Sequence, residues 1–106
     1  MASNKYKVKL SINARNELDS IFAYIANTLD SPTTAAELSL KIYDTILSLD
    51  EMPNRFPRIT EEIPTSEEYR KAIVKNYVIL YLINEDNKIV NIAHVFHGSM
   101  NYIKYI

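Results

Sequence analysis

The last third of the chain alternates apolar and polar stretches in a way that predicts three consecutive β-strands. The middle stretch, Tyr77–Ile83, is apolar on both faces of the pleat, which is typical of a strand at the centre of a covered sheet. Its neighbours, Tyr69–Val74 and Ile89–His97, are joined to it by Lys75-Asn76 and by a short polar turn. Asn76 tolerates a left-handed backbone, and such short links predict an antiparallel meander.

The first half of the chain predicts one strand and two helices. Residues Lys5–Leu10 alternate lysines with apolar residues, and we interpret this as an edge strand protected by its lysines rather than as a phosphate-binding surface. Apolar residues at helical spacing predict a helix over Ala14–Leu29, with Asn13 as its N-cap. Another helix is predicted over Ser31–Asp50, with Ser31 as cap and a proline at its first position. The short connection predicts an antiparallel helical hairpin.

These elements predict an α+β fold in which the helical hairpin covers one face of a mostly antiparallel sheet. The other face of the sheet is expected to be open and concave. Residues 52–68 hold three prolines and four glutamates, so we expect an irregular, acidic loop there. The place of the first strand in the sheet is left open. A length of 106 residues suits a single domain over residues 1–106.

Composition narrows the classes of function. The chain has no cysteine, which excludes disulfides, thiolate zinc sites and a cysteine nucleophile. A net charge of −1 gives no nucleic-acid signature, although residues 69–106 are modestly basic and could favour an anionic ligand. The sequence shows no membrane span and no signal peptide, and we expect a cytoplasmic protein. A single glycine and the absence of His/Asp/Glu clusters at metal spacing predict neither a phosphate loop, a metal nor another cofactor.

Four segments carry a resemblance to a known family: SINARNELDSIFAYI, SPTTAAELSLKIYDTILSLDEMPNRFP, YRKAIVKNYVILYLI and IVNIAHVFHG. Together they resemble the RelE/ParE superfamily of toxins from bacterial type II toxin–antitoxin modules, and more closely its ParE-like branch. The resemblance implies a growth inhibitor that is neutralised by a cognate antitoxin and binds a target such as DNA gyrase. Two alternatives stay open: a ribosome-dependent mRNA endonuclease, and a non-toxic remnant that only binds an antitoxin.

Cleavage of RNA without a metal needs a general base, a general acid and fixed cations near the phosphate. The weak catalytic candidates are Arg70, His97 and Tyr102. His94 and His97 should point to opposite faces of an unbroken strand, and only a bulge could bring them together. His94 is expected to share a face with apolar neighbours and to be a partly buried, satisfied histidine. Its expected neighbours on that face are Val90, Ile92 and Phe96.

The family pattern implies cationic residues that this chain lacks. Ribonuclease members resembling this fold carry arginine near the position of Val78, and ParE-like members often carry an arginine pair where Ser99 and Met100 stand. Tyr102 matches an aromatic position in the tail. We therefore predict action by binding rather than by cleavage. The candidate binding residues are Arg70, Lys71, Lys75, His94, His97 and Tyr102.

Overall fold

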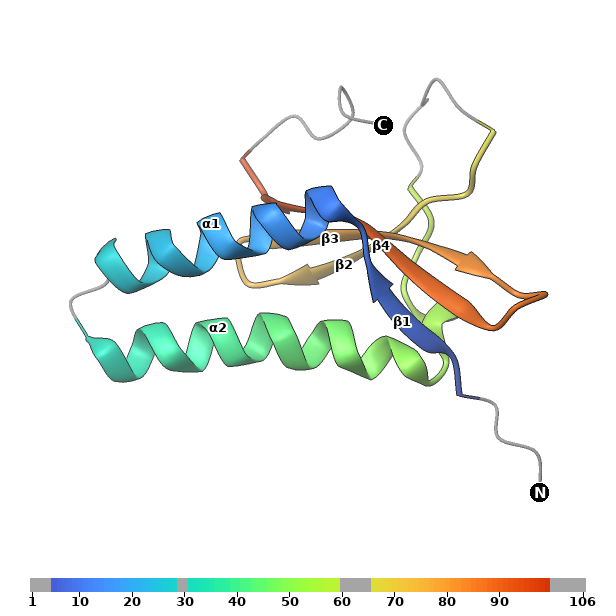
Figure 1. Ribbon diagram of the computed structural model, residues 1–106. Helices are drawn as coiled ribbons and strands as arrows, with labels where there is room; N and C mark the ends of the chain where they lie inside the picture. Colours follow the sequence, from blue (N-terminus) through green and yellow to red (C-terminus); the bar gives the residue numbers. More distant parts are fainter. Residues whose placement is uncertain (1–4, 29–30, 60–65, 100–106) are drawn as a thin grey trace.

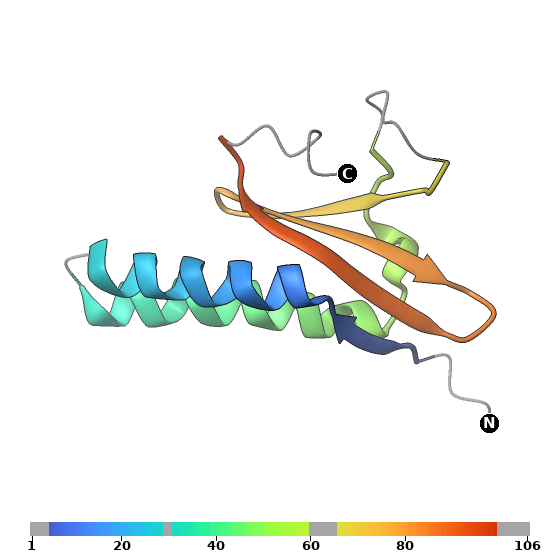
Figure 2. The ribbon, with the colours of Figure 1, turned by 45° about the horizontal axis from the view of Figure 1, so that its top comes forward.

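The computed structural model describes residues 5–28, 31–59 and 66–99. Two long helices lie side by side and antiparallel on one face of a twisted sheet (Figures 1 and 2). The predicted α+β order is confirmed. In chain order the elements are β1 (Lys7–Leu10), α1 (Ile12–Thr28), α2 (Pro32–Leu47), the short 3-10 helices η1 (Ser48–Asp50) and η2 (Pro53–Arg55), β2 (Arg70–Val74), β3 (Tyr77–Asn84) and β4 (Ile89–His97).

The sheet has the strand order β1-β4-β3-β2. Strands β2, β3 and β4 form the predicted antiparallel meander, and β3 lies inside the sheet as its apolar sequence requires. The place of the first strand, which the sequence left open, is beside β4, and the two strands run parallel. Strands β1 and β2 are therefore the edges. On β1, Lys7 and Lys9 are exposed while Val8 and Leu10 are partly buried, as the edge-strand prediction requires.

The two helices start at serine caps. The Ser31 hydroxyl accepts the backbone N–H of Thr34 at 3.3 Å, which confirms the predicted cap of α2. For α1 the predicted cap, Asn13, is wrong. The hydroxyl of Ser11 instead accepts the N–H of Ala14 at 2.9 Å. Ser11 also donates to the carbonyl of Ala93 at 2.7 Å, so the cap is chosen by a contact with β4 that local sequence does not reveal.

Helix α2 ends at Leu47, and the chain continues as η1 instead of completing the predicted helix to Asp50. Arg55 stabilises this end, since its guanidinium donates to the carbonyls of Ser48 at 3.2 Å and Glu51 at 2.7 Å. Unpaired carbonyls at a helix end need such donors. The connection is also bent at Met52, whose φ of 48° lies in the left-handed region.

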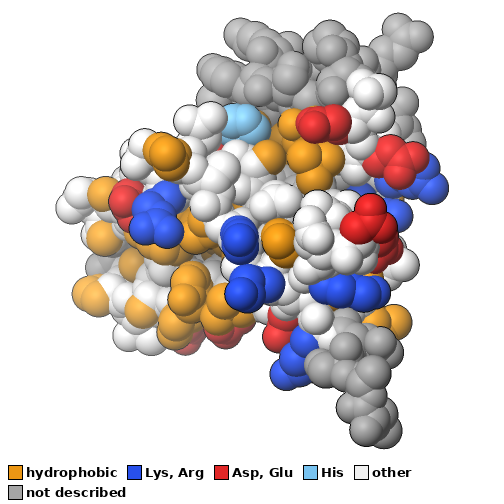
Figure 3. All heavy atoms as spheres, turned by 45° about the vertical axis from the view of Figure 1, so that its right-hand side comes forward, with side chains coloured by type: hydrophobic (Ala, Val, Ile, Leu, Met, Phe, Trp, Pro, Cys, Tyr) orange, Lys and Arg blue, Asp and Glu red, His pale blue; other side chains and the backbone are white. Residues whose placement is uncertain are grey.

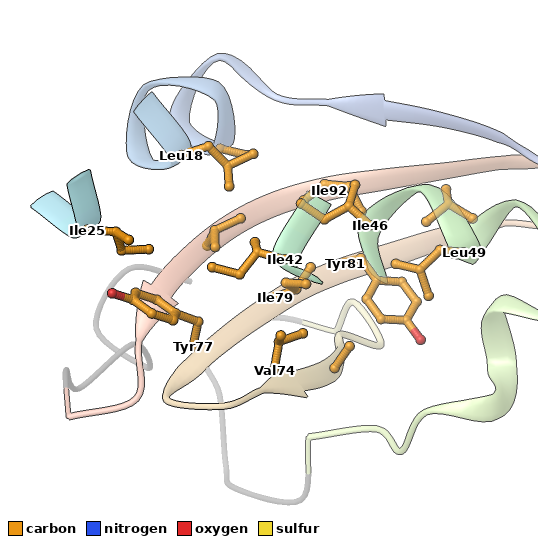
Figure 4. Packing of buried hydrophobic residues seen from close by; sticks show 14 of the residues in the cluster. Leu18, Ile25, Ile42, Ile46, Leu49, Val74, Tyr77, Ile79, Tyr81 and Ile92 are labelled. Atoms are coloured by element: carbon orange, nitrogen blue, oxygen red, sulfur yellow. The ribbon is translucent and has the colours of Figure 1, made fainter. Parts of the chain in front are cut away.

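The main core lies between the helices and the sheet (Figure 4). Tyr81 at its centre is fully buried, and its hydroxyl donates to the carbonyl of Pro53. Burial raises the pKa of Tyr81 to about 12. The buried members of this core are Ala14, Leu18, Ile25, Ala35, Ile42, Ile46, Leu49, Ala72, Val74, Tyr77, Ile79, Tyr81, Val90, Ile92 and Val95.

The opposite face of the sheet is not fully open, contrary to the expectation from sequence. Val78, Leu80 and Phe96 form a second buried cluster there, and Ile59 and Tyr69 pack against it. The chain after η2 therefore partly covers this face. No helix in the described part of the chain is long and apolar enough to cross a membrane.

Candidate functional site

A β-bulge in β4 decides where the two histidines point. Leu80 of β3 pairs with His94, whereas the next residue, Tyr81, pairs with Ile92. Ala93 is thus the extra residue, and it shifts the alternation of side chains along β4. His94 and Phe96 both follow the bulge and share a face, as predicted, and their rings stack at 5.0 Å between centroids.

The bulge corrects one prediction and leaves another intact. His94 does not share a face with Val90 and Ile92, because those two residues precede the bulge and belong to the main core. The bulge cannot unite the two histidines, because both His94 and His97 follow it. They therefore still alternate across the strand, as predicted.

His94 is partly buried and satisfied, as predicted, but its partner was missed. Its Nδ1 lies 3.0 Å from Oε2 of Glu17 on α1, and Glu17 Oε1 accepts the backbone N–H of Val95 at 3.0 Å. Since a carboxylate only accepts hydrogen bonds, Nδ1 of His94 carries the hydrogen. The paired part of β1 stops opposite Ile92, so Glu17 replaces a strand neighbour along the rest of β4. No local signal marks this glutamate, because its partners lie in the distant last strand.

His97 is the last residue of the same strand and lies beside the turn between β2 and β3. Its Nδ1 lies 3.2 Å from the backbone nitrogen of Ser99 and 2.7 Å from the Ser99 hydroxyl. Nδ1 accepts the backbone N–H, so the neutral ring carries its hydrogen on Nε2. The ring also meets Tyr77 edge-on at 5.4 Å. His97 is thus held in a fixed orientation by the chain's own groups.

Two lysines line a shallow pocket that His97 also borders from the end of β4, although its ring lies on the helix side of the strand beside Tyr77. Lys71 lies in β2 opposite Leu80, and Lys75 forms the turn. Lys75 has a φ of 54°, so it, and not Asn76 as predicted, adopts the left-handed conformation. The pocket is lined by Lys71, Ile73, Lys75, Asn76, Val78, His97, Gly98 and Ser99. The lining residues among 5–28, 31–59 and 66–99 include no carboxylate, so this part of the lining suits an anionic group.

Gly98 closes the pocket against the turn. Its N–H donates to the carbonyl of Asn76 at 2.5 Å. A Cβ at position 98 would lie only 3.1 Å from that same oxygen. The single glycine of the chain therefore stands where the end of β4 must approach the β2–β3 turn closely.

Arg70 lies apart from this pocket. It pairs with Tyr81, on the helix-covered side of β2, and donates to the carbonyls of Phe56 at 2.6 Å and Asn54 at 3.2 Å. Its guanidinium thereby holds the loop after η2 against the sheet. Of the neighbouring candidates Arg70 and Lys71, only Lys71 lies on the face away from the helices.

The remaining candidates add no second acid–base group among the described residues. Tyr102 and Met100 lie outside the described residues. Val78, near an arginine position of the ribonuclease pattern, is buried in the second cluster. No group of three or more His, Cys, Asp or Glu that could hold a metal occurs among residues 5–28, 31–59 and 66–99. The face in Figure 3 mixes basic and acidic side chains instead of forming one basic surface.

Comparison with known proteins agrees with this architecture. The chain is similar over 90% of its length to a chain of the chromosomal ParDE system from Pseudomonas aeruginosa, of which 98% is covered, with 18% identity and a TM-score of 0.68. An archaeal RelE–RelB complex from Pyrococcus horikoshii matches at 17% identity and a TM-score of 0.60, covering 90% of this chain and 97% of that one. RelBE2 from Mycobacterium tuberculosis matches at 20% identity and a TM-score of 0.58, covering 88% and 98%.

These identities establish the shared fold alone. No curated protein matches the sequence. The family described as "ParE toxin of type II toxin-antitoxin system, parDE" matches residues 8–102, which span β1 to β4 and extend into the tail. The match includes both helices, the meander and the pocket beside His97. The chain therefore belongs to the ParE toxin family of the RelE/ParE superfamily.

Proposed function

We propose that this ParE-family toxin inhibits growth by binding a macromolecular target, with DNA gyrase as the first candidate, and not by cleaving RNA. The observation that carries the proposal is the separation of its titratable groups. His94 is bonded to Glu17, Arg70 is bonded to loop carbonyls, and only His97 among these residues lines the pocket with lysines. His97 and the lysines can bind an anionic surface, but these residues do not provide the general base and general acid that RNA cleavage needs.

We further propose that a cognate antitoxin holds the toxin inactive in the cytoplasm by covering the helical hairpin. Leu40, Tyr43 and Leu47 of α2 are 58%, 45% and 46% exposed. Their spacing puts them on one stripe of the helix, away from the buried stripe of Ile42 and Ile46. Exposed apolar side chains in such a row suit the apolar face of a partner helix. The chain is near neutral, so apolar anchors should contribute more to this complex than charge steering.

Growth assays with and without the neighbouring gene test both proposals. Expression of the toxin alone should arrest growth, and the neighbouring product should relieve the arrest and co-purify with the toxin. Replacing Leu40 and Leu47 by serine should weaken that complex while leaving the arrest in place. Ile12→Ser is a matched control, because Ile12 is 80% exposed at the start of α1. A toxin that remains a monomer beside the neighbouring product would contradict the antitoxin proposal.

Purified toxin should then inhibit supercoiling by gyrase, and His97→Ala should weaken the inhibition. Replacing both Lys71 and Lys75 by glutamate should weaken it further. The matched control for charge replaces Lys7 and Lys9, on the opposite edge of the sheet, by glutamate. Inhibition that is the same in all these variants would rule out the pocket as the contact surface. Normal supercoiling beside arrested growth would remove gyrase as the target.

One observation favours a second candidate, the mRNA endonuclease. The pocket gathers His97 with Lys71 and Lys75, and a histidine among cations is the kind of group that can promote phosphoryl transfer. In that case, primer extension on translated mRNA would show codon-phased cuts that disappear in His97→Ala.

A further inference from the structure

Two neighbouring pockets lie between helix α1 and the end of β4. They share Ser20, Ile21 and His97, and their volumes are about 490 Å³ and about 390 Å³. Volumes of this size are typical of sites for small molecules. Because they share these residues, the two pockets form one groove, the α1–β4 groove. Its other lining residues are Asn16, Glu17, Tyr24, Tyr77, Val95, Phe96 and Ser99.

The floor of the α1–β4 groove is apolar and firmly packed. Tyr77 and Val95 are buried members of the main core, and Ile21 packs against that core. The Tyr77 ring also meets the His97 ring edge-on at 5.4 Å. Tyr24, by contrast, is 63% exposed on α1, so its side chain is free to change rotamer beside an occupant. A preformed apolar floor beside a movable aromatic side chain suits a flat aromatic ring.

The polar side chains around this floor favour an uncharged occupant. Glu17 is the one carboxylate that the described residues contribute to the lining, and it already accepts the N–H of Val95 and lies against Nδ1 of His94. In that same part of the chain, no lysine or arginine lines either pocket. Burial and, to a smaller extent, the neighbouring Tyr24 raise the pKa of Tyr77, so its hydroxyl stays uncharged. A charged occupant would thus lose water without gaining a counter-ion.

The end of β4 adds a backbone donor and a backbone acceptor. The Gly98 N–H bonds to the Asn76 carbonyl across the sheet, so the N–H of His97 points the other way, away from β3. The C=O of Val95 also points away from β3, on the side where Glu17 accepts the N–H of the same residue. Within residues 5–28, 31–59 and 66–99, nothing bonds to these two backbone groups. An amide supplies an acceptor for such an N–H and a donor for such a C=O.

We propose that the α1–β4 groove binds an uncharged aromatic amide of small-molecule size. The aromatic ring lies on the floor beside Tyr24 and Tyr77, and the amide group bonds to the free backbone groups of Val95 and His97. The inference goes beyond the proposed function, because it concerns neither the exposed row on α2 nor the lysines beside the β2–β3 turn.

The test titrates benzamide into the full chain labelled with nitrogen-15. The amide signals of Ser20, Ile21 and His97 should shift, and the benzamide protons should show nuclear Overhauser contacts to the ring of Tyr77. Two matched compounds separate the parts of the inference. Benzoate replaces the amide by a charged group, and cyclohexanecarboxamide replaces the aromatic ring by an aliphatic one. Each should bind at least about threefold more weakly than benzamide.

Surface variants supply the second arm of the test. Tyr24→Ala should weaken the binding of benzamide about threefold or more. Ser20→Gln places a longer side chain where the two pockets meet and should weaken it similarly. The matched controls Tyr43→Ala and Ala36→Gln change exposed residues of α2 outside both pockets, and they should bind benzamide normally. All four side chains are exposed, so the variants should keep the spectrum of the folded protein.

Several results would overturn the inference. One is the absence of binding at millimolar benzamide, and another is a set of shifted signals away from the groove. Equal binding of benzoate would exclude the uncharged class, and equal binding of cyclohexanecarboxamide would exclude the aromatic one. If a short peptide that contains phenylalanine binds the groove and benzamide does not, the groove is a surface for a protein partner. The proposed function is separable, since a toxin that arrests growth and is relieved by its antitoxin can still fail to bind benzamide.

Discussion

Replacing Glu17 by alanine should destabilise the end of β4, because the Glu17 carboxylate accepts hydrogen bonds where no neighbouring strand pairs with β4 on that side. Beyond Ile92, β4 has β3 on one side and no β1 on the other. Glu17 fills that place by accepting hydrogen bonds from the Val95 N–H and from Nδ1 of His94, both at 3.0 Å. Alanine keeps the helix but removes both acceptors.

The expected change in the free energy of unfolding follows from the hydrogen-bond donors that Glu17→Ala leaves unpaired. Val95 is 1% exposed, so its N–H has little access to water once the carboxylate is gone. An orphaned buried donor costs about 1–3 kcal/mol, and a hydrogen bond to a charged group contributes about 1.5–3 kcal/mol. These ranges describe the same loss, and we expect Glu17→Ala to lower the free energy of unfolding by about 2 kcal/mol. Glu17→Gln keeps one oxygen for Val95 and should cost about 1 kcal/mol.

Urea denaturation measures these differences, with Asp19→Ala as the matched control. Asp19 lies on the same helix and is exposed, so its removal should change stability by less than about 0.5 kcal/mol. Hydrogen exchange supplies a local readout, because the Val95 amide should exchange faster in Glu17→Ala and not in Asp19→Ala. Equal stabilities of the two variants, with Val95 still protected, would refute the role assigned to Glu17.

Three further predictions concern the core, the bend after α2 and the pocket. Burial raises the pKa of Tyr81 from 10.0 to about 12, so the unfolded chain loses this proton first. The stability that Tyr81 contributes should be constant below about pH 10 and fall towards pH 12. The fall should be flatter in Tyr81→Phe, and an unchanged profile in that variant would contradict this. Met52 is 71% exposed with a φ of 48°. Met52→Gly should therefore raise the free energy of unfolding by about 0.5 kcal/mol, whereas Met52→Ala should not. Equal denaturation curves for the two variants would argue against backbone strain at this residue. Gly98→Ala crowds the Asn76 carbonyl, 3.1 Å from the added Cβ, and should lower the free energy of unfolding by about 1 kcal/mol relative to the control Asp19→Ala. A cost no larger than that of the control would exclude a steric role.

Local sequence signals predicted the fold well. The doubly apolar β3, the two-residue link after β2 and the Ser31-Pro32 start of α2 each act over a few residues, and each is found in the structure. The parallel pairing of β1 with β4 was not predicted, because nothing local to β1 distinguishes the two possible edges of the meander.

The site was less predictable because its contacts are distant in sequence. Ser11 is preferred to Asn13 as a cap because its hydroxyl also reaches Ala93. The bulge at Ala93 changes the face on which His94 lies, and no residue of β4 signals it. The roles of Lys71, Lys75 and His97 in binding remain predictions, although the structure does bring these three residues to one pocket.

Primer extension on mRNA from cells arrested by the toxin tests the central claim most directly. The claim is that this protein acts by binding, since His97 has no matched acid–base partner among the described residues and Ser99 stands where an arginine is expected. Loss of one donor that stabilises the transition state costs on the order of a hundredfold in rate. Action by binding predicts growth arrest with intact mRNA. Codon-phased cleavage that disappears in His97→Ala would contradict it.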